Sequence, residues 1–195
     1  MTRPMRFVLF GLLLVCATLA YGTQAPKYIF LFIGDGMGFN HVEASQIYAE
    51  KVGTDTGERS LLFPTFPVMT QVCTRSASHL ITCSSAAATA LATGEKTTNY
   101  VIGMDAKKQH GLKSLARQLK GKGYKIGIIT SASIDHATPG GFYASQPDRS
   151  MYYEIGVDAA NSGFDFFGGA GLLQPRSKRN ASAPCLYDLF HQKGY

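Results

Sequence analysis

Apolar stretches alternate with glycine-rich and polar stretches along the chain, and this alternation predicts strands and helices in turn. Residues 27–33 form an apolar, β-rich run that ends at the glycine-rich segment 34–38. This pattern predicts a central strand, buried on both faces, followed by a tight turn. Apolar residues at helical spacing follow over 40–52, where Asn40 and Glu43 resemble a capping box. The order strand, turn, helix is typical of one unit of an α/β sheet.

The same alternation continues to the end of the chain. An alanine-dominated run with serine and threonine at its start predicts a helix that begins near Ser84. We also expect strands at 68–74, at 124–130 and at 164–167, and we expect the strand at 124–130 to be buried. Further helices are expected at 112–119, at 151–160 and after Pro184. These elements together predict an α/β fold with a mostly parallel central sheet and helices on both faces. The earlier helix at 112–119 is followed by Gly123 and Tyr124 and then by a core strand. The last helix is likewise followed by Gly194 and Tyr195, so we expect that another strand should follow and that the fold is incomplete at its C-terminus.

The first 25 residues have the pattern of a secretory signal peptide. Arg3 and Arg6 precede an apolar run that ends near Ala20, and small residues follow up to Ala25. The run is shorter than the roughly 20 residues that a membrane-spanning helix needs. We therefore expect export to the periplasm or the extracellular space, a mature domain over 26–195, and no transmembrane segment after cleavage. A lipid anchor at Cys16 is the alternative.

Charge and cysteine content exclude several classes of protein. The net charge of +6 is spread along the chain, and no basic run with interleaved aromatic residues is present, so we expect no nucleic-acid partner. Beyond Cys16, the cysteines at positions 73, 83 and 185 are odd in number and widely spaced. They form neither a disulfide framework nor a zinc finger, and at most one bridge could join them.

Three polar clusters follow predicted strands, where open α/β sheets bind ligands. Asp35 lies in the glycine turn, where a carboxylate can meet a cation. Ser84 lies at a helix N-terminus, which stabilises an alkoxide or an anionic substrate. His136 and Thr138 could face one cation, and Arg149 could hold two phosphate oxygens. Each cluster alone has a structural alternative: a capping aspartate, a capping serine, or a solvated histidine or arginine.

The combination and order of these motifs resemble the alkaline phosphatase family from residue 27 to residue 149, and the stretch 164–171 is also similar to that family. The resemblance implies that Asp35 bridges a zinc and the magnesium site, and that Ser84 is the nucleophile. It further implies that His136 and Thr138 line the magnesium site and that Arg149 holds the substrate phosphate. Counting back from Gly94 favours Ser84 over its neighbour as the family's serine.

By this resemblance the expected activity is metal-dependent hydrolysis of phosphomonoesters through a phosphoserine intermediate. The implied cofactors are two Zn²⁺ and one Mg²⁺, with zinc as an alternative at the magnesium site because His136 offers a nitrogen ligand. Small phosphomonoesters and inorganic phosphate are the expected partners, and a homodimer is one arrangement that the sequence allows. The family's other metal ligands come from a C-terminal half that is not in this sequence, so we expect residues 1–195 to be inactive alone.

One departure from the family keeps two alternatives open. Family members usually carry an aspartate, which helps to orient the arginine, where this chain has Cys83. That change favours a non-catalytic phosphate-binding protein as one alternative. A phosphodiesterase of the same superfamily is the other, because loops outside this sequence set the substrate specificity. A sulfatase is disfavoured, because the Cys-x-Pro-x-Arg pattern is missing.

Overall fold

The fold is known from a computed structural model that describes residues 25–52 and 61–195. Residues 1–24 of the predicted signal peptide, which spans 1–25, lie outside the described residues. The chain divides into two compact units, Met1–Gly34 and Asp35–Tyr195, and the helices and strands named below belong to the second. In the described ranges, no helix is long and apolar enough to cross a membrane.

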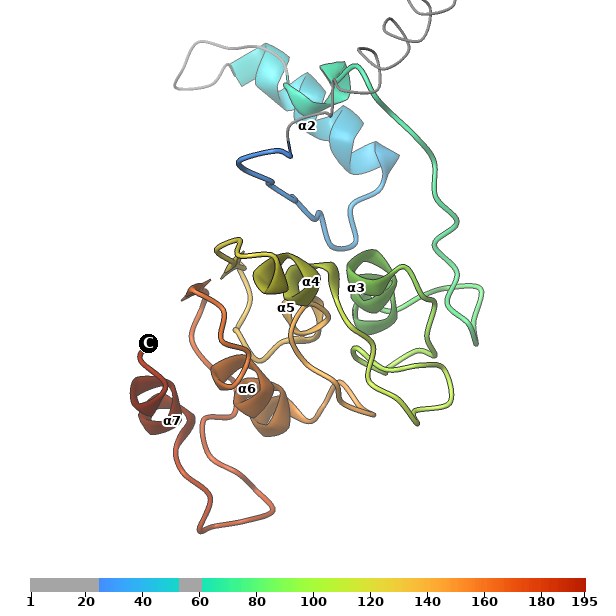
Figure 1. The fold of residues 1–195 in the computed structure, drawn as a ribbon. Helices are drawn as coiled ribbons and strands as arrows, with labels where there is room; N and C mark the ends of the chain where they lie inside the picture. The colour runs from blue at the N-terminus through green and yellow to red at the C-terminus, as the bar shows by residue number, and fades with distance from the viewer. Residues whose placement is uncertain (1–24, 53–60) are drawn as a thin grey trace, which may run out of the picture. The chain divides into compact units, whose positions relative to one another are not determined.

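The helices agree with the pattern of apolar residues. The elements in chain order are α2 (Phe39–Val52), the 3-10 turn η1 (Phe63–Thr65), α3 (Ser84–Thr93), α4 (Leu115–Gly121), β1 (Gly127–Ile129), α5 (Ala137–Gly140), α6 (Tyr152–Ala160), β2 (Phe166–Gly168) and α7 (Leu186–Gln192) (Figure 1). All five predicted helices are therefore confirmed, with ends that differ by a few residues. The short helix α5 was not predicted, because its four residues are too few to show a periodicity.

The two strands confirm the expected parallel pairing but are shorter than predicted. β1 and β2 pair in parallel, with Gly127 opposite Phe166 and Ile129 opposite Gly168. The prediction that the first of these strands is buried is wrong, because Gly127 and Ile129 are both exposed. Within the described residues this sheet has two strands, which leaves much of their surface uncovered and explains the exposure.

Two other predicted strands are not formed. Residues 27–33 and 68–74 have no strand assignment, and their apolar side chains are exposed, with Phe32 at 90% and Val68 at 84%. Apolar sequence alone does not make a strand, because its N–H and C=O groups need a neighbouring backbone with which to pair. No ladder partner for either stretch is found among residues 25–52 and 61–195. The apolar face predicted for α2 (Ala44, Ile47, Tyr48 and Val52) is also exposed, whereas Ala49, outside that face, is buried.

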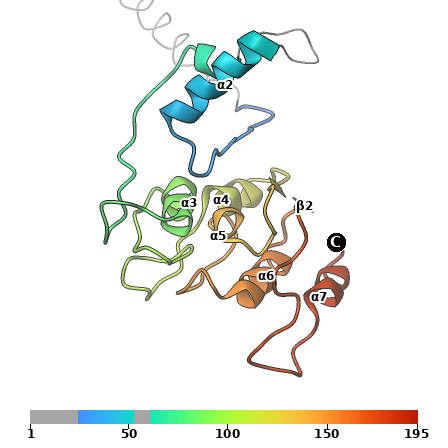
Figure 2. The same cartoon turned by 180° about the vertical axis from the view of Figure 1, so that it is seen from behind.

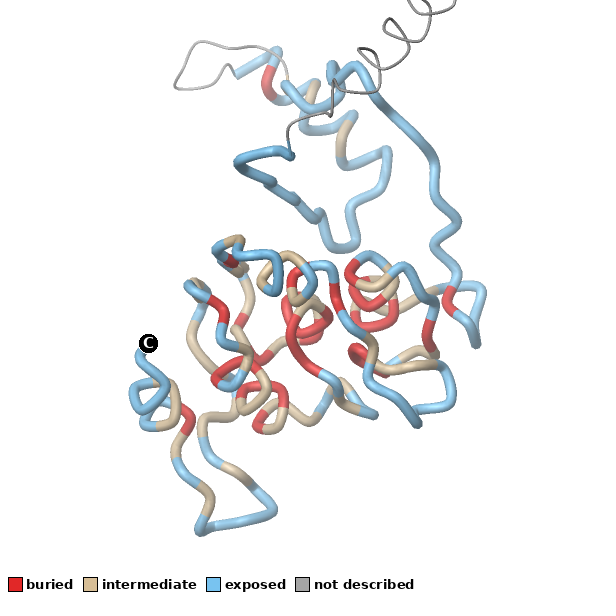
Figure 3. Tube along the Cα trace, in the orientation of Figure 1, coloured by how far each residue is buried: buried red, intermediate tan, exposed pale blue. Residues whose placement is uncertain are grey.

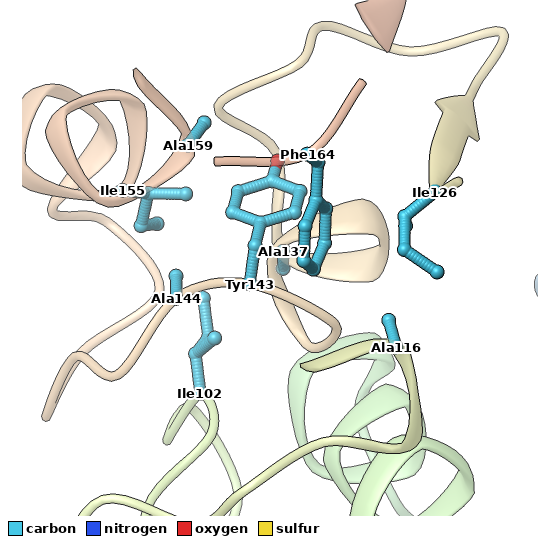
Figure 4. Packing of buried hydrophobic residues seen from close by; sticks show 9 residues of the cluster. All are labelled: Ile102, Ala116, Ile126, Ala137, Tyr143, Ala144, Ile155, Ala159 and Phe164. Atoms are coloured by element: carbon cyan, nitrogen blue, oxygen red, sulfur yellow. The ribbon is translucent and has the colours of Figure 1, made fainter. Parts of the chain in front are cut away.

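The hydrophobic core lies along the segments from α3 to α6, where the buried residues gather (Figure 3). Tyr143, at 1% exposed, packs with Ile102, Ile155 and Phe164 in this cluster (Figure 4). Its hydroxyl donates a hydrogen bond to the carbonyl of Ile134. Burial, with a smaller effect of nearby carboxylates, raises the pKa of Tyr143 well above its usual value. The tyrosine therefore stays a neutral hydrogen-bond donor inside the core.

Small residues let α3 and α5 pack closely, and α3, α4 and α5 lie beside one another in both views (Figures 1 and 2). The face of α3 that is buried consists mainly of alanines, including Ala88. Gly141 follows α5, and a Cβ atom added to it would lie 2.7 Å from the Cβ of Ala88. The backbones of the two helices thus approach as closely as alanine and glycine allow.

Candidate active site

The carboxylate of the first polar cluster, Asp35, contacts a hydroxyl from each of the other two. Asp35 Oδ1 accepts a hydrogen bond from Ser84 Oγ at 3.1 Å, and Asp35 Oδ2 accepts one from Thr138 Oγ1 at 2.6 Å. The two contacts span 49 and 103 residues of sequence. Gly36, next to the carboxylate, has a φ of 73°, which glycine adopts without strain. The glycine turn therefore presents Asp35 to both hydroxyls.

Ser84 owes its position to the start of α3. Cys83 is the N-cap residue, with extended backbone angles (φ −111°, ψ 166°), and Ser84 is the first residue of this ten-residue helix. The unpaired N–H groups and the dipole of a helix create partial positive charge at its N-terminus. The Ser84 hydroxyl lies where a negative oxygen or a phosphate anion is stabilised.

The neighbouring serine has a different environment. Ser85 is fully buried, and its Oγ lies 3.0 Å from Cys83 Sγ, within hydrogen-bonding distance. Ser84 is partly exposed and contacts Asp35 instead. Of the two hydroxyls, Ser84 is the one that solvent and a substrate can reach.

A buried aspartate anchors the segment that carries His136 and Thr138. Asp135 is 0% exposed and accepts hydrogen bonds from the backbone N–H groups of Leu173 and Gln174, both at 2.9 Å. His136 is the N-cap residue of α5, and Thr138 is its second residue. These hydrogen bonds hold the segment from which the Thr138 hydroxyl donates to Asp35.

The ring of His136 has an unused nitrogen. Its Nδ1 atom is buried and has no hydrogen-bond partner among the residues that the structure describes. Buried polar atoms without a partner are rare, because each loses its hydrogen bonds to water. His136 lies two residues before Thr138 in the sequence, and its unpartnered nitrogen could bind a ligand such as a metal ion.

Arg149 is held by a backbone hydrogen bond, whereas its guanidinium has no hydrogen-bond or salt-bridge partner within the described ranges. The Arg149 N–H donates to the carbonyl oxygen of Tyr100 at 2.7 Å. Its guanidinium makes no hydrogen bond or salt bridge with any residue in the described ranges. The structure thus brings Asp35 into contact with both Ser84 and Thr138, whereas within the described ranges Arg149 is held through its main chain.

Cys83 takes part in several contacts at the start of α3. Its Sγ accepts a hydrogen bond from the N–H of Tyr100 at 3.1 Å, and its own N–H donates to Asn99 Oδ1 at 3.2 Å. Partial burial raises the pKa of the Cys83 thiol, but hydrogen bonds with Ser85, Tyr100 and Ala86 together outweigh that effect. The pKa of Cys83 therefore lies below its usual value. Cys73, Cys83 and Cys185 are all free.

The donor set at this site suits a metal ion but is incomplete by itself. A carboxylate, hydroxyls and an imidazole are ligands that zinc and magnesium accept in proteins. Within residues 25–52 and 61–195, however, no group of three or more His, Cys, Asp or Glu side chains could hold a metal ion. These residues can form only one part of a coordination sphere.

Some residues that shape the site carry no signal in the sequence. The supporting contacts of Asp135 are made to backbone groups far along the chain, and periodicity does not reveal them. The same holds for Tyr100, which has a positive φ of 72° without a glycine to mark it. Gly141, in a run of two glycines, is a sequence feature that is compatible with the close approach of α5 to α3.

Comparison with known proteins agrees with these features. The alkaline phosphatase family model matches residues 26–165. Alkaline phosphatase 4 of Drosophila melanogaster is 34% identical over 149 residues, which cover 72% of this chain and 25% of the fly protein. The chain thus spans about a quarter of the length of that curated relative.

Solved structures agree as well. Thermus thermophilus alkaline phosphatase superposes with a TM-score of 0.70 at 28% identity and covers 84% of this chain, which covers 34% of that protein. A mutant of the alkaline phosphatase from the Antarctic bacterium TAB5, with Mg bound in its M3 site, gives a TM-score of 0.65 at 27% identity. It covers 77% of this chain, which covers 42% of the mutant. The α/β fold, the Asp35 contacts and the match over residues 26–165 together place this chain in the alkaline phosphatase family.

Proposed function

We propose that residues 26–195 are the N-terminal part of an enzyme that hydrolyses small phosphate monoesters through a phosphoserine at Ser84. One observation carries the proposal: the carboxylate of Asp35 accepts hydrogen bonds from both the Ser84 and the Thr138 hydroxyls. Asp35 thereby holds the Ser84 hydroxyl at the N-terminus of α3, where an anion is stabilised and the hydroxyl can act as a nucleophile.

Ser84 Oγ would attack the phosphorus of the ester. The Ser84 hydroxyl loses its proton to solvent as the new Oγ–P bond forms, the bond from phosphorus to the ester oxygen breaks, and the departing alkoxide takes up a proton from solvent and leaves as the alcohol. Water then cleaves the Oγ–P bond and releases inorganic phosphate. Asp35 holds the Ser84 hydroxyl in one orientation, and the N-terminus of α3 stabilises negative charge on Oγ and on the phosphoryl oxygens.

The residues present fit one side of a metal centre. Asp35 would bridge two ions, Ser84 would contribute its oxygen to one of them, and Thr138 and His136 would line the site of the other. The unpartnered Nδ1 of His136 supports this assignment and admits zinc as well as magnesium there. Two Zn²⁺ and one Mg²⁺ would supply positive charge that activates oxygen nucleophiles and neutralises the phosphate. Further ligands from outside residues 1–195 would complete these sites, so we expect residues 1–195 alone to be inactive.

Arg149 would bind two oxygens of the phosphate. Its backbone is fixed by Tyr100, and its guanidinium has no partner in the described part of the chain, which leaves its N–H donors for an anion. A guanidinium matches a phosphate with two parallel hydrogen bonds, which a lysine does not. We further propose export, directed by the predicted signal peptide.

The test uses the full-length protein, meaning residues 1–195 with whatever its coding region specifies after Tyr195. Turnover of a nitrophenyl phosphate monoester is measured beside the corresponding diester, in buffer with zinc and magnesium and after chelation. We expect monoester turnover that chelation abolishes, loss of turnover in Ser84→Ala, and retained turnover in the matched variant Ser85→Ala.

Three results would contradict the proposal. Preferred turnover of the diester would indicate a phosphodiesterase. Phosphate binding without any turnover would indicate a binding protein. Activity that survives Ser84→Ala and is lost in Ser85→Ala would assign the nucleophile to the other serine.

A further inference from the structure

The segment around Tyr100 connects the residue before the proposed nucleophile to the proposed phosphate-binding arginine. Cys83 Sγ accepts the Tyr100 N–H at 3.1 Å, and the Tyr100 carbonyl accepts the Arg149 N–H at 2.7 Å. One residue thus uses both its backbone groups to join two segments of the site. This connection passes through main-chain atoms and does not require the guanidinium to touch Cys83.

Tyr100 has a conformation that must be held in place. Its φ of 72° lies in the left-handed region, which is uncommon for a residue with a Cβ atom. Such strain persists only where surrounding contacts fix it, and it is concentrated at functional sites. The hydrogen bonds to Cys83 and Arg149 engage both backbone groups of Tyr100 here.

Further hydrogen bonds hold the connection on both sides. The side-chain amide of Asn99 accepts from the Cys83 N–H and donates to the Ile81 carbonyl, which closes residues 99–100 against 81–83. On the other side, Ile102 and Gln146 form an antiparallel bridge with two backbone hydrogen bonds, of 3.0 and 2.9 Å. A shift of Tyr100 would therefore be passed to Arg149 and not absorbed by a loose loop.

We propose that Cys83 is a positioning residue for phosphate binding and acts on Arg149 through Tyr100. The inference rests on the proposed function, because it assigns a role within the same site. In the family pattern an aspartate at this position helps to orient the arginine, whereas the sulfur of Cys83 holds the backbone of the segment on which the arginine is anchored. The Cys83 thiol would therefore influence the affinity for phosphate without contacting the phosphate.

The experiment measures kcat, KM for a monoester and the inhibition constant of inorganic phosphate in the full-length protein. Cys83→Ala leaves the Tyr100 N–H without its acceptor, and we expect KM and the phosphate inhibition constant to rise together about tenfold. We expect kcat to change by less than about twofold, since lost ground-state binding raises KM alone. Cys83→Ser keeps an acceptor and should recover most of the affinity. Cys73→Ala, at an exposed free cysteine, is the matched control and should behave as wild type.

A double-mutant cycle separates positioning from a merely structural role. If Cys83 acts through Arg149, then Cys83→Ala should have almost no further effect on the phosphate inhibition constant once Arg149→Ala is present. Additive effects of the two substitutions would overturn the inference, and so would an unchanged phosphate inhibition constant in Cys83→Ala. A wild-type protein without monoester turnover would overturn the proposed function and this inference together, whereas an active wild type with an additive cycle would overturn the inference alone.

Discussion

The close contact between α3 and α5 offers a direct way to disturb the site without touching a polar residue. Gly141→Ala adds a Cβ atom that would lie 2.7 Å from Ala88 Cβ, 2.9 Å from the Ala88 carbonyl carbon and 3.1 Å from the Thr89 backbone nitrogen. The φ and ψ of Gly141, −55° and −21°, are acceptable for alanine. The substitution therefore introduces no backbone strain and destabilises the folded state through steric contact.

The expected magnitude follows from those distances. Carbon atoms in contact prefer about 3.5–4.0 Å, so the two backbones must separate by roughly 1 Å. Overpacking of this kind costs about 1–3 kcal/mol of the free energy of unfolding. Ser84 begins α3 and Thr138 lies on α5, so the same shift would loosen both contacts with Asp35. A misplacement of about 1 Å can lower kcat/KM by about a hundredfold.

Urea unfolding and monoester turnover of the full-length protein test this prediction. The control is Gly121→Ala at the end of α4, where an added Cβ meets no atom within 4 Å. We expect the control to be neutral or slightly more stable, and Gly141→Ala to lose both stability and activity. Equal unfolding midpoints and equal turnover for the two variants would refute the proposed role of this contact.

Other contacts give three further predictions, each checked by urea unfolding. Asp135→Ala leaves two backbone N–H groups without their buried acceptor and should cost about 3 kcal/mol; a loss no larger than that of an exposed alanine substitution would contradict it. Ser114→Ala removes the side chain that caps α4 and donates to the Phe142 carbonyl, and it should cost about 1–2 kcal/mol. The hydrogen bond from Lys120, followed by one from a backbone N–H, holds the pKa of Asp165 far below its usual range. Asp165→Asn should therefore be less stable than wild type at neutral pH. This difference should shrink progressively as the pH falls below about 4, where the unfolded carboxylate is protonated, and should be lost only where the folded-state carboxylate is protonated too. A difference independent of pH would contradict the prediction.

The sequence predicted the helices well because each has a local cause. The alanine-rich run after Cys83 has few alternatives to a helix, and α3 begins at Ser84 as expected. The strands depended on partners elsewhere in the molecule. The apolar run 27–33 has strong β propensity, but propensity is realised only when a neighbouring backbone is paired with it.

For the candidate site, the sequence singled out residues but gave no geometry. Family resemblance singled out Asp35, Ser84 and Thr138, and the structure brings these three into contact. No periodicity in the sequence specifies contacts over 49 and 103 residues. The strained Tyr100 and its hydrogen bond to the Cys83 sulfur were not predictable, because neither residue type signals that conformation.

The central claim is that Ser84 is the nucleophile, oriented by Asp35. The most direct measurement mixes the full-length protein with a phosphomonoester, quenches the reaction in acid and maps the phosphorylated peptide by mass spectrometry. The proposed mechanism predicts one phosphoryl group on Ser84, none in Ser84→Ala, and an unchanged site of labelling in Ser85→Ala. An active enzyme whose phosphoryl group is found on another residue, or is never covalently bound, would contradict it.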